Sequence, residues 1–330
     1  MERMRRVSVL LILTGFFSFP SISKTDGVGR NARVAAAVAD LRKEPSVPSS
    51  EREHDVLEES QLLYGEVVSV LEETPDWIRI SAPQQMEFTH NNRWDGYPGW
   101  IQRAALVLEP DGWNQNAVVR VKQGQVRNQP DSQAPLVLKL SAGSRLMAVE
   151  PVQEWWKVRL LDGSDGWIRK EELMTWQEQD PLADNPREWR ARVVASARLF
   201  LGDPYYWGGR SAYDPDAAAP PHTGPDCSGL VGLAYQITGA VIPRDAHEQW
   251  MNARKIRREE LQPGDLVFLF DPDDSDRANH VLLYTGDGKV LEGPGTGGAV
   301  REIPLEERLR GETGRRAEYG SYLPRMNSTR

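Results

Sequence analysis

The sequence predicts a multidomain chain in which two small all-β barrels, at residues 31–108 and 116–175, precede an α+β domain at residues 186–330. In the first half, short alternating apolar runs are separated by Gly, Pro and Asp turns, a pattern typical of small antiparallel barrels. These runs recur as a degenerate internal repeat, which is a stronger signal than any one strand. The second half alternates helical and strand-like patterns. A length of 330 residues accommodates two or three domains.

The repeat pairs short segments of the two barrels. Residues 41–45 match 126–130, residues 77–80 match 156–159, and residues 99–101 match 166–168. The first copy has an insertion between its tryptophans. That insertion, residues 81–95, is polar and carries His90.

Composition limits the partners. The chain is 39% hydrophobic and 27% charged, which is ordinary for a globular protein, and its net charge is -8. A nucleic-acid partner is excluded on this basis because phosphate binding needs a basic surface.

Residues 1–23 are predicted to be a targeting segment. Arg3 and Arg5 begin a basic region, and residues 7–19 form an apolar run that is short for a membrane span. We expect removal of this segment, export to the periplasm or cell wall, and no stable membrane insertion afterwards. The alternative is a retained N-terminal anchor.

The chain has one cysteine, Cys227, so it cannot form an intrachain disulfide. Apolar residues after it recur at helical spacing, with Asp226 as the expected N-cap and Gly239 as the expected stop. In the first turn of a helix, free N–H groups and the helix dipole favour a thiolate. The alternative is that Cys227 is a small buried hydrophobic residue.

Flanking elements are also predicted. Residues 176–188 have the composition of a polar linker. A helix should follow with Asn185 as its cap and Pro186 at its first position, and Arg190 is expected on its solvated face. Residues 266–270 are a continuous apolar run suited to a buried strand.

The strand that His280 opens is expected to form a hairpin through the loop 286–288. Thr285 would then face Lys289, and His280 and Glu292 would lie on the same face of the sheet as diagonal neighbours. A carboxylate there can fix the imidazole tautomer and stabilise the imidazolium. The alternative for Glu292 is a solvent-facing strand end.

Three motifs carry a family resemblance: PYYWGG at 204–209, DCSGL at 226–230 and HVLLYTGDGKV at 280–290. Together they resemble the NlpC/P60 family of papain-like cell-wall cysteine peptidases, over roughly residues 186–315. The resemblance implies a papain-like α+β fold with Cys227 as nucleophile and His280 as general base.

The resemblance also implies further site residues. The position that orients the histidine falls at Glu292, where the family usually has His, Asn or Gln. Tyr205 would position the nucleophile or hold the oxyanion, and Asp226 and Ser228 would contact substrate. No cofactor is implied, and His222 has no second ligand at metal spacing, so no metal is expected.

The two barrels resemble bacterial SH3 (SH3b) domains, and the whole order resembles the γ-D-glutamyl-L-diamino acid endopeptidases. The substrate implied is the peptidoglycan stem peptide L-Ala-γ-D-Glu-diamino acid. In those enzymes an acidic residue and a tyrosine of the first SH3b domain hold the free amino group of L-Ala. These two roles are expected at Glu66 and Tyr97. The alternatives are an amidase of the same fold acting on another amide or ester, and a non-catalytic cell-wall-binding protein.

Overall fold

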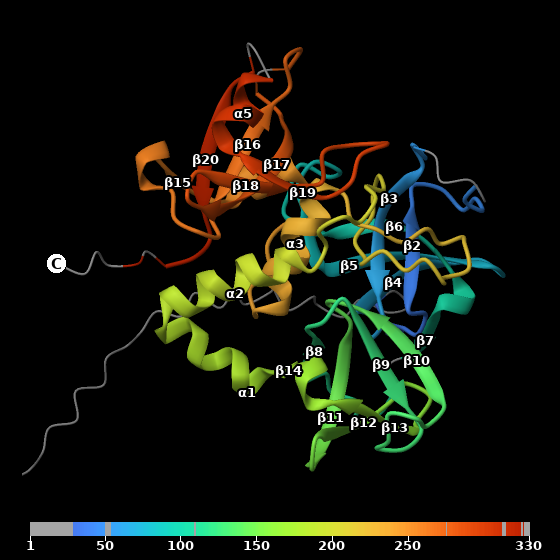
Figure 1. The fold of residues 1–330 in the computed structure, drawn as a ribbon. Helices are drawn as coiled ribbons and strands as arrows, with labels where there is room; N and C mark the ends of the chain where they lie inside the picture. Colours follow the sequence, from blue (N-terminus) through green and yellow to red (C-terminus); the bar gives the residue numbers. More distant parts are fainter. Residues whose placement is uncertain are drawn as a thin grey trace, which may run out of the picture.

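The computed structural model describes residues 29–49, 54–108, 110–274, 276–311, 315–324 and 326. The predicted targeting segment, residues 1–23, lies outside the described residues. The chain forms two β-domains and a C-terminal domain, and the helices α2 (Pro186–Arg198) and α3 (Cys227–Ile237) of the C-terminal domain lie between its strands and the β-domains (Figure 1). Within the described part of the chain, every helix is too short or too polar to cross a bilayer.

The first β-domain is a seven-stranded antiparallel sheet in the order β3-β2-β6-β5-β4-β1-β7. Its strands are β1 Asn31–Val34, β2 Val38–Arg42, β3 Glu58–Leu63, β4 Val67–Glu73, β5 Trp77–Glu87, β6 Asp95–Gln102 and β7 Leu106–Leu108, with a short 3-10 turn at Arg103–Ala105. Small and aliphatic side chains from these strands fill one core.

The second β-domain has the same strand order, β10-β9-β13-β12-β11-β8-β14. Its strands are β8 Ala117–Val119, β9 Gln123–Arg127, β10 Leu136–Ser141, β11 Arg145–Val152, β12 Trp155–Arg159, β13 Asp165–Arg169 and β14 Leu173–Thr175, with a 3-10 turn at Lys170–Glu172. The repeat found in the sequence therefore corresponds to a repeated topology.

A glycine occupies the same turn in both β-domains and has positive φ in each, at Gly65 and Gly143. A Cβ on Gly65 would lie 2.3 Å from the carbonyl oxygen of Arg145, and one on Gly143 would lie 2.6 Å from the side chain of Leu233. Each turn thus presses against a neighbouring domain, where only glycine combines this φ with this close approach.

The connection to the C-terminal domain is helical, contrary to the predicted linker. It comprises α1 Trp176–Gln179 and a 3-10 turn at Asp180–Asp184. Glu178 accepts hydrogen bonds from the backbone N–H and the hydroxyl of Thr175 at 2.8 and 2.9 Å, which holds the first turn of α1. Polar composition alone did not reveal this local capping.

The C-terminal domain packs helices on both faces of a six-stranded antiparallel sheet. Its helices are α2 Pro186–Arg198, α3 Cys227–Ile237, α4 Ala246–Asn252 and α5 Leu305–Arg310. The sheet order is β15-β20-β16-β17-β18-β19. The strands are β15 Arg254–Ile256, β16 Leu266–Phe270, β17 Ala278–Gly286, β18 Lys289–Glu292, β19 Arg301–Pro304 and β20 Ala317–Ser321, and a 3-10 turn lies at Arg258–Glu260.

Helices α2, α3 and α4 cover one face of this sheet, and α5 packs on the other. The predicted strand 266–270 is β16, and all five of its residues are buried. Buried residues of both β-domains, Leu63 and Ala142, join the core around α2 and α3. The three domains therefore share packing at the centre of the molecule.

Helix α2 begins as predicted, with Asn185 accepting a hydrogen bond from the N–H of Glu188 and Pro186 in the first turn. The prediction for Arg190 was wrong. Its side chain is buried and pairs with Asp265 at 2.8 Å while donating to the carbonyl of Pro324. The guanidinium joins α2 to the start of β16 and to the end of the chain.

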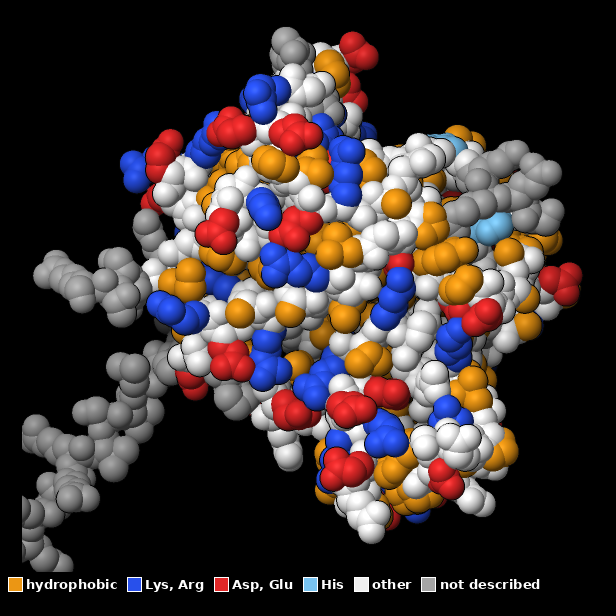
Figure 2. Space-filling model, in the orientation of Figure 1, with side chains coloured by type: hydrophobic (Ala, Val, Ile, Leu, Met, Phe, Trp, Pro, Cys, Tyr) orange, Lys and Arg blue, Asp and Glu red, His pale blue; other side chains and the backbone are white. Residues whose placement is uncertain are grey.

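Charges of both signs are interspersed on the face of the molecule shown in Figure 2. No extended area of one sign is visible over the described residues drawn there.

Candidate active site

Cys227 is the first residue of α3, and 7% of its surface is exposed. The predicted cap is confirmed, because the carboxylate of Asp226 accepts a hydrogen bond from the N–H of Gly229 at 2.6 Å. The helix ends at Ile237, with Gly239 at positive φ just beyond it. The sulfur therefore lies where the helix dipole favours a negative charge.

The PYYWGG and DCSGL motifs meet through their backbones. The N–H of Asp226 donates to the carbonyl of Gly209 at 2.9 Å, and that of Tyr206 donates to Pro225 at 3.2 Å. A Cβ on Gly229 would lie 2.3 Å from the Gly209 carbonyl oxygen. The glycines of both motifs thus allow the turn at 206–209 to lie directly against the start of α3.

His280 and Glu292 meet as the hairpin geometry predicted. The Nε2 atom of His280 lies 2.8 Å from the Oε2 atom of Glu292, and both side chains are buried. With Nε2 on Glu292, Nδ1 is the nitrogen that remains for the Cys227 sulfur, which lies close enough to favour the charged imidazole. Cys227, His280 and Glu292 thus come together from α3, β17 and β18.

The hairpin turn itself differs from the prediction. Leu283 pairs with Leu291 and Tyr284 with Val290, in the predicted register, but Lys289 pairs with Gly286 and not with Thr285. Asp287 and Gly288 both have positive φ. This is the two-residue turn that Asp-Gly favours, and a bulge at Thr285 restores the register of the strands.

His280 and Glu292 each stabilise the charged form of the other. Burial alone would lower the pKa of His280, but the Cys227 sulfur and Glu292 outweigh burial and raise that pKa to about 9. Burial alone would raise the pKa of Glu292, but hydrogen bonds from His280, Arg308 and Arg301 outweigh it and lower that pKa to about 2. The site is therefore arranged for an imidazolium beside a carboxylate at neutral pH.

Tyr205 lies beside Cys227. Burial raises the pKa of its phenol, with smaller contributions in the same direction from Cys227 and Asp226, so the hydroxyl stays protonated. Its ring comes within 3.3 Å of the position that a Cβ of Gly293 would occupy. A protonated phenol at this place can donate a hydrogen bond towards the reacting centre.

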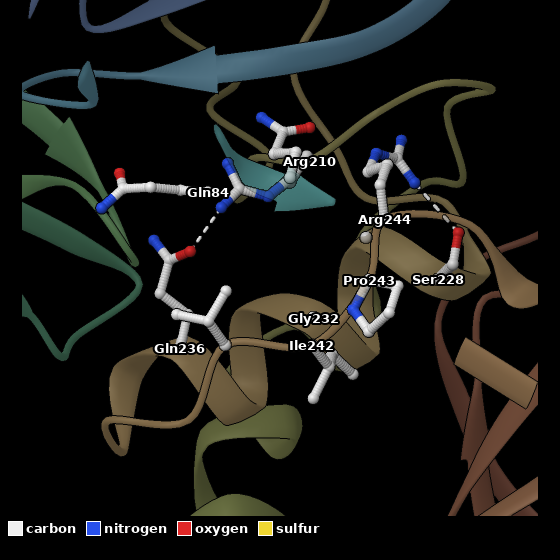
Figure 3. Close-up of a pocket in the computed structure, with 11 residues that line it drawn as sticks. Gln84, Arg210, Ser228, Gly232, Gln236, Ile242, Pro243 and Arg244 are labelled. Carbon is white, nitrogen blue, oxygen red and sulfur yellow. Dashed lines mark hydrogen bonds between the residues drawn. The ribbon is translucent and has the colours of Figure 1, made fainter. Parts of the chain in front are cut away.

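Asp226 and Ser228 flank Cys227, and both are bound by Arg244. The guanidinium donates to Oδ2 of Asp226 at 2.8 Å. The same guanidinium donates to the Ser228 hydroxyl at 2.9 Å, as Figure 3 shows. It also donates to Oγ of Ser60 in the first β-domain. Arg244 was not singled out in the sequence, although it directly precedes Asp245, the N-cap residue of α4.

The first β-domain brings an acidic cluster to the same region. The hydroxyl of Tyr97 lies 3.1 Å from Glu59 and 3.0 Å from Asp245. His90, from the predicted insertion, is 3.7 Å from Glu59 and 3.0 Å from Glu87, and its ring packs edge-on against Tyr97. Burial raises the pKa of Asp245 to about 7, despite the opposing charge of Arg244.

The expected role of Glu66 does not fit its position. Its side chain is 1% exposed and pairs with Arg210 at 2.8 Å, and one of its oxygens also accepts from the N–H of Leu63. A carboxylate enclosed in this way is not open to a substrate. The acidic neighbour of Tyr97 is Glu59, on β3, which the sequence analysis missed.

Comparison with known proteins now decides the family. Residues 202–313 match the model of the NlpC/P60 family, and residues 122–174 match that of the bacterial SH3 domain. A gamma-D-glutamyl-L-lysine dipeptidyl-peptidase of Bacillus cereus is 30% identical to this chain over 250 residues, covering 75% of this chain and 70% of that protein. The chain belongs to the NlpC/P60 family.

Two further comparisons cover most of this NlpC/P60 chain. A gamma-D-glutamyl-L-lysine dipeptidyl-peptidase of Bacillus subtilis is 27% identical over 251 residues, covering 76% of this chain and 77% of that protein. The crystal structure of an NlpC/P60 family protein from Bacillus cereus superposes with a TM-score of 0.72 at 25% identity, covering 89% of this chain and 100% of that chain. The similarity therefore extends beyond the NlpC/P60 domain into both β-domains.

Proposed function

We propose that this protein is a cell-wall cysteine peptidase that hydrolyses the γ-D-Glu–diamino acid bond of peptidoglycan stem peptides. The observation that carries the proposal is the 2.8 Å contact between His280 and Glu292, with Cys227 beside the imidazole at the N-terminus of α3. Two relatives carry the name gamma-D-glutamyl-L-lysine dipeptidyl-peptidase, which supports this substrate class.

In the proposed reaction, Cys227 and His280 form a thiolate–imidazolium pair. The thiolate attacks the carbonyl carbon of the scissile amide, and the imidazolium gives its proton to the leaving amine of the diamino acid. His280, now neutral, takes a proton from water as that water attacks the thioester. The acyl–sulfur bond breaks, the acyl product leaves as a carboxylic acid, and the thiolate–imidazolium pair is regenerated.

The developing oxyanion has two donors close by. One is the backbone N–H of Cys227, which lies in the first turn of α3 and has no partner within the helix. The other is the phenol of Tyr205, which is held protonated by burial. Preorganised donors of this kind stabilise the tetrahedral intermediate because they need no rearrangement during the reaction.

We further propose that Glu59, Tyr97 and Asp245 hold the free amino group of the N-terminal L-Ala. A primary ammonium entering a partly closed cleft needs carboxylate partners, and this cluster offers two beside a phenol. Glu59 takes the role that the sequence analysis gave to Glu66. In this proposal both β-domains are SH3b domains: the second matches that family, and the first shares its strand order.

Two alternatives remain distinct from this function. An amidase of the same fold would use the same thiol on another amide or ester. A non-catalytic cell-wall-binding protein would make no use of it. The presence of competent groups at all three catalytic positions favours an enzyme.

Mass spectrometry of products tests the proposal. The wild-type protein should convert L-Ala-γ-D-Glu-diaminopimelate, or its L-lysine counterpart, into L-Ala-D-Glu and the diamino acid. Cys227→Ala should keep its fold and lose activity by on the order of 10⁴-fold or more, since no covalent route remains. Cleavage at another bond would favour the amidase, and absence of any turnover of either peptide would favour the binding protein.

A further inference from the structure

Glu292 is hydrogen-bonded by two arginines as well as by His280. Arg301 donates to Oε1 of Glu292 from Nε at 3.1 Å and from Nη2 at 2.8 Å. Nε of Arg308 lies 2.9 Å from Oε1 and 2.8 Å from Oε2 of the same carboxylate. Glu292 is fully buried, so each of its oxygens is shared between charged donors in a place that water does not reach.

The two arginines come from different elements. Arg301 lies on β19, directly opposite Glu292 in the pairing of β18 with β19. Arg308 belongs to α5, which packs on the same sheet. The side chain of Arg301 is 50% exposed and that of Arg308 is 10% exposed. Arg308 is therefore the less screened of the two charges.

A buried carboxylate beside an imidazole can act in two ways. Alone, it binds the proton of the imidazolium strongly, which makes the histidine a poor acid. Two guanidinium groups draw charge away from the carboxylate, fix its orientation and oppose the positive charge of the imidazolium. The proton on the imidazolium then becomes easier to give to a leaving amine.

We propose that Arg308, together with Arg301, is a positioning pair that orients Glu292 towards His280 and sets the pH range in which the thiolate–imidazolium pair exists. This inference rests on the proposed function of Cys227 and His280 as nucleophile and base. Arg308 and Arg301 act through Glu292 and touch no reacting atom.

Among the described residues, charged and titratable groups face Cys227 and His280 from several elements. Cys227 faces His280 from α3, Glu292 from β18, and the two arginines lie behind Glu292 on β19 and α5. On the far side of the thiol, Asp226 is paired with Arg244, and the phenol of Tyr205 is neutral. The unusually low pKa of Glu292, about 2, agrees with its two arginine partners.

The test follows the pH dependence of Cys227 alkylation by iodoacetamide, which needs no substrate and labels the one cysteine of the chain. Arg308→Gln removes a positive charge, which favours the protonated forms of both partners. The labelling profile, and both limbs of the kcat/KM profile, should move to higher pH by about half to one unit. Arg301→Gln should move them less, since solvent screens its half-exposed side chain.

Removing a negative charge should move the limbs of the pH profiles in the opposite direction. Glu292→Gln leaves both guanidinium groups beside the imidazole without their carboxylate, so the limbs should move to lower pH. The double variant Glu292→Gln/Arg308→Gln should lie between the two single variants. Arg308→Lys keeps the charge, and its limbs should stay near those of the wild type while its plateau rate falls.

Arg310→Gln is the matched control, because Arg310 lies on the same helix and is bonded to the carbonyl of Glu306. If Arg310→Gln moves the limbs of the pH profile as far as Arg308→Gln does, the shift comes from the loss of any nearby positive charge. The inference is then wrong. It is also wrong if Arg308→Gln lowers the rate at every pH without moving a limb. If Arg308→Gln does not fold, Arg301→Gln carries the same comparison. Shifted labelling in a protein that cuts no stem peptide would refute the proposed function alone.

Discussion

The two β-domains share one strand order but contact the C-terminal domain in different ways. In the first, the hairpin strands β5 and β6 have 11 and 8 residues, against 5 and 5 for β12 and β13 in the second. The longer hairpin reaches α4, where Thr89 donates to Glu248 and the carbonyl of Met86 accepts from the N–H of Arg244.

The second β-domain instead contacts the C-terminal domain away from these residues. Lys122 pairs with Asp203, Lys139 pairs with Asp214 at 2.6 Å, and Ser141 accepts from the N–H of Ala212. One topology therefore makes two different junctions with the C-terminal domain, and the longer hairpin of the first β-domain distinguishes them.

The largest expected effect comes from breaking the junction of the first β-domain. Glu66→Gln leaves Arg210 buried without its carboxylate partner, and it removes the charge that favours the buried Arg145. We expect a loss of about 3–5 kcal/mol in the free energy of unfolding, measured by urea denaturation.

The matched change in the second β-domain is Lys139→Gln. The ion pair of Lys139 is partly exposed, so its loss should cost less than about 1 kcal/mol. Equal losses for the two variants would show that both β-domains are held in the same way.

The second largest effect should be on the KM for the free peptide. Glu59→Gln and Tyr97→Phe each remove one partner of the proposed ammonium site, while Glu150→Gln changes an exposed carboxylate of the second β-domain. The first two should raise KM for the free peptide roughly 10- to 100-fold, as expected for a lost charged hydrogen bond, with little change in kcat. Glu150→Gln should have no effect.

The same assay should compare each peptide with its N-acetylated form. The wild-type protein should cut only the free form, and Glu59→Gln should narrow that difference. If the wild-type protein cuts both forms equally, the first β-domain does not select peptides by their free amino group.

The smallest effect concerns pH and His90. Hydrogen bonding to Glu59, opposed by burial and aided by Glu87, raises the pKa of His90 to about 9. The imidazolium therefore stabilises the folded state fully below the unfolded pKa of about 6.5, and this contribution is lost as pH rises through about 9. The ring is one third exposed, so we expect less than about 1 kcal/mol.

His90→Gln should remove that pH dependence. The difference in Tm between wild type and variant should be largest near pH 6 and should vanish above pH 9. A difference that stays constant from pH 6 to 10 would show that His90 contributes by packing alone.

Local chemistry explains what could be predicted from the sequence. The α3 cap at Asp226, the buried strand β16 and the shared face of His280 and Glu292 all follow from interactions within a few residues or from the two-residue period of a strand. The bulge at Thr285 was missed because Asp287-Gly288 was taken with Gly286 as a three-residue loop.

The residues that were misplaced depend on contacts between distant segments. Arg190 is buried because α2 packs beside the start of β16, and Glu66 is buried because three domains meet around it. Arg301 and Arg308 follow the catalytic motifs in sequence and belong to no motif. Their role becomes visible only when β19 and α5 fold back onto Glu292.

The length of the β5–β6 hairpin is constrained by the two-residue period of its strands. Ala82 pairs with Tyr97 and the next pair is Met86 with Gly96, so residues 83–85 bulge out of β5. Gln84 and Gln85 in this bulge line a small pocket that α3 also lines, with Gln84 labelled in Figure 3. Beyond this bulge the strands pair regularly. Adding or removing two residues on each strand there would move the tip by about 7 Å and keep every side chain on its face, whereas a change of one would invert the faces. The distance by which this hairpin extends towards α4 can therefore change only in steps of two residues on each strand.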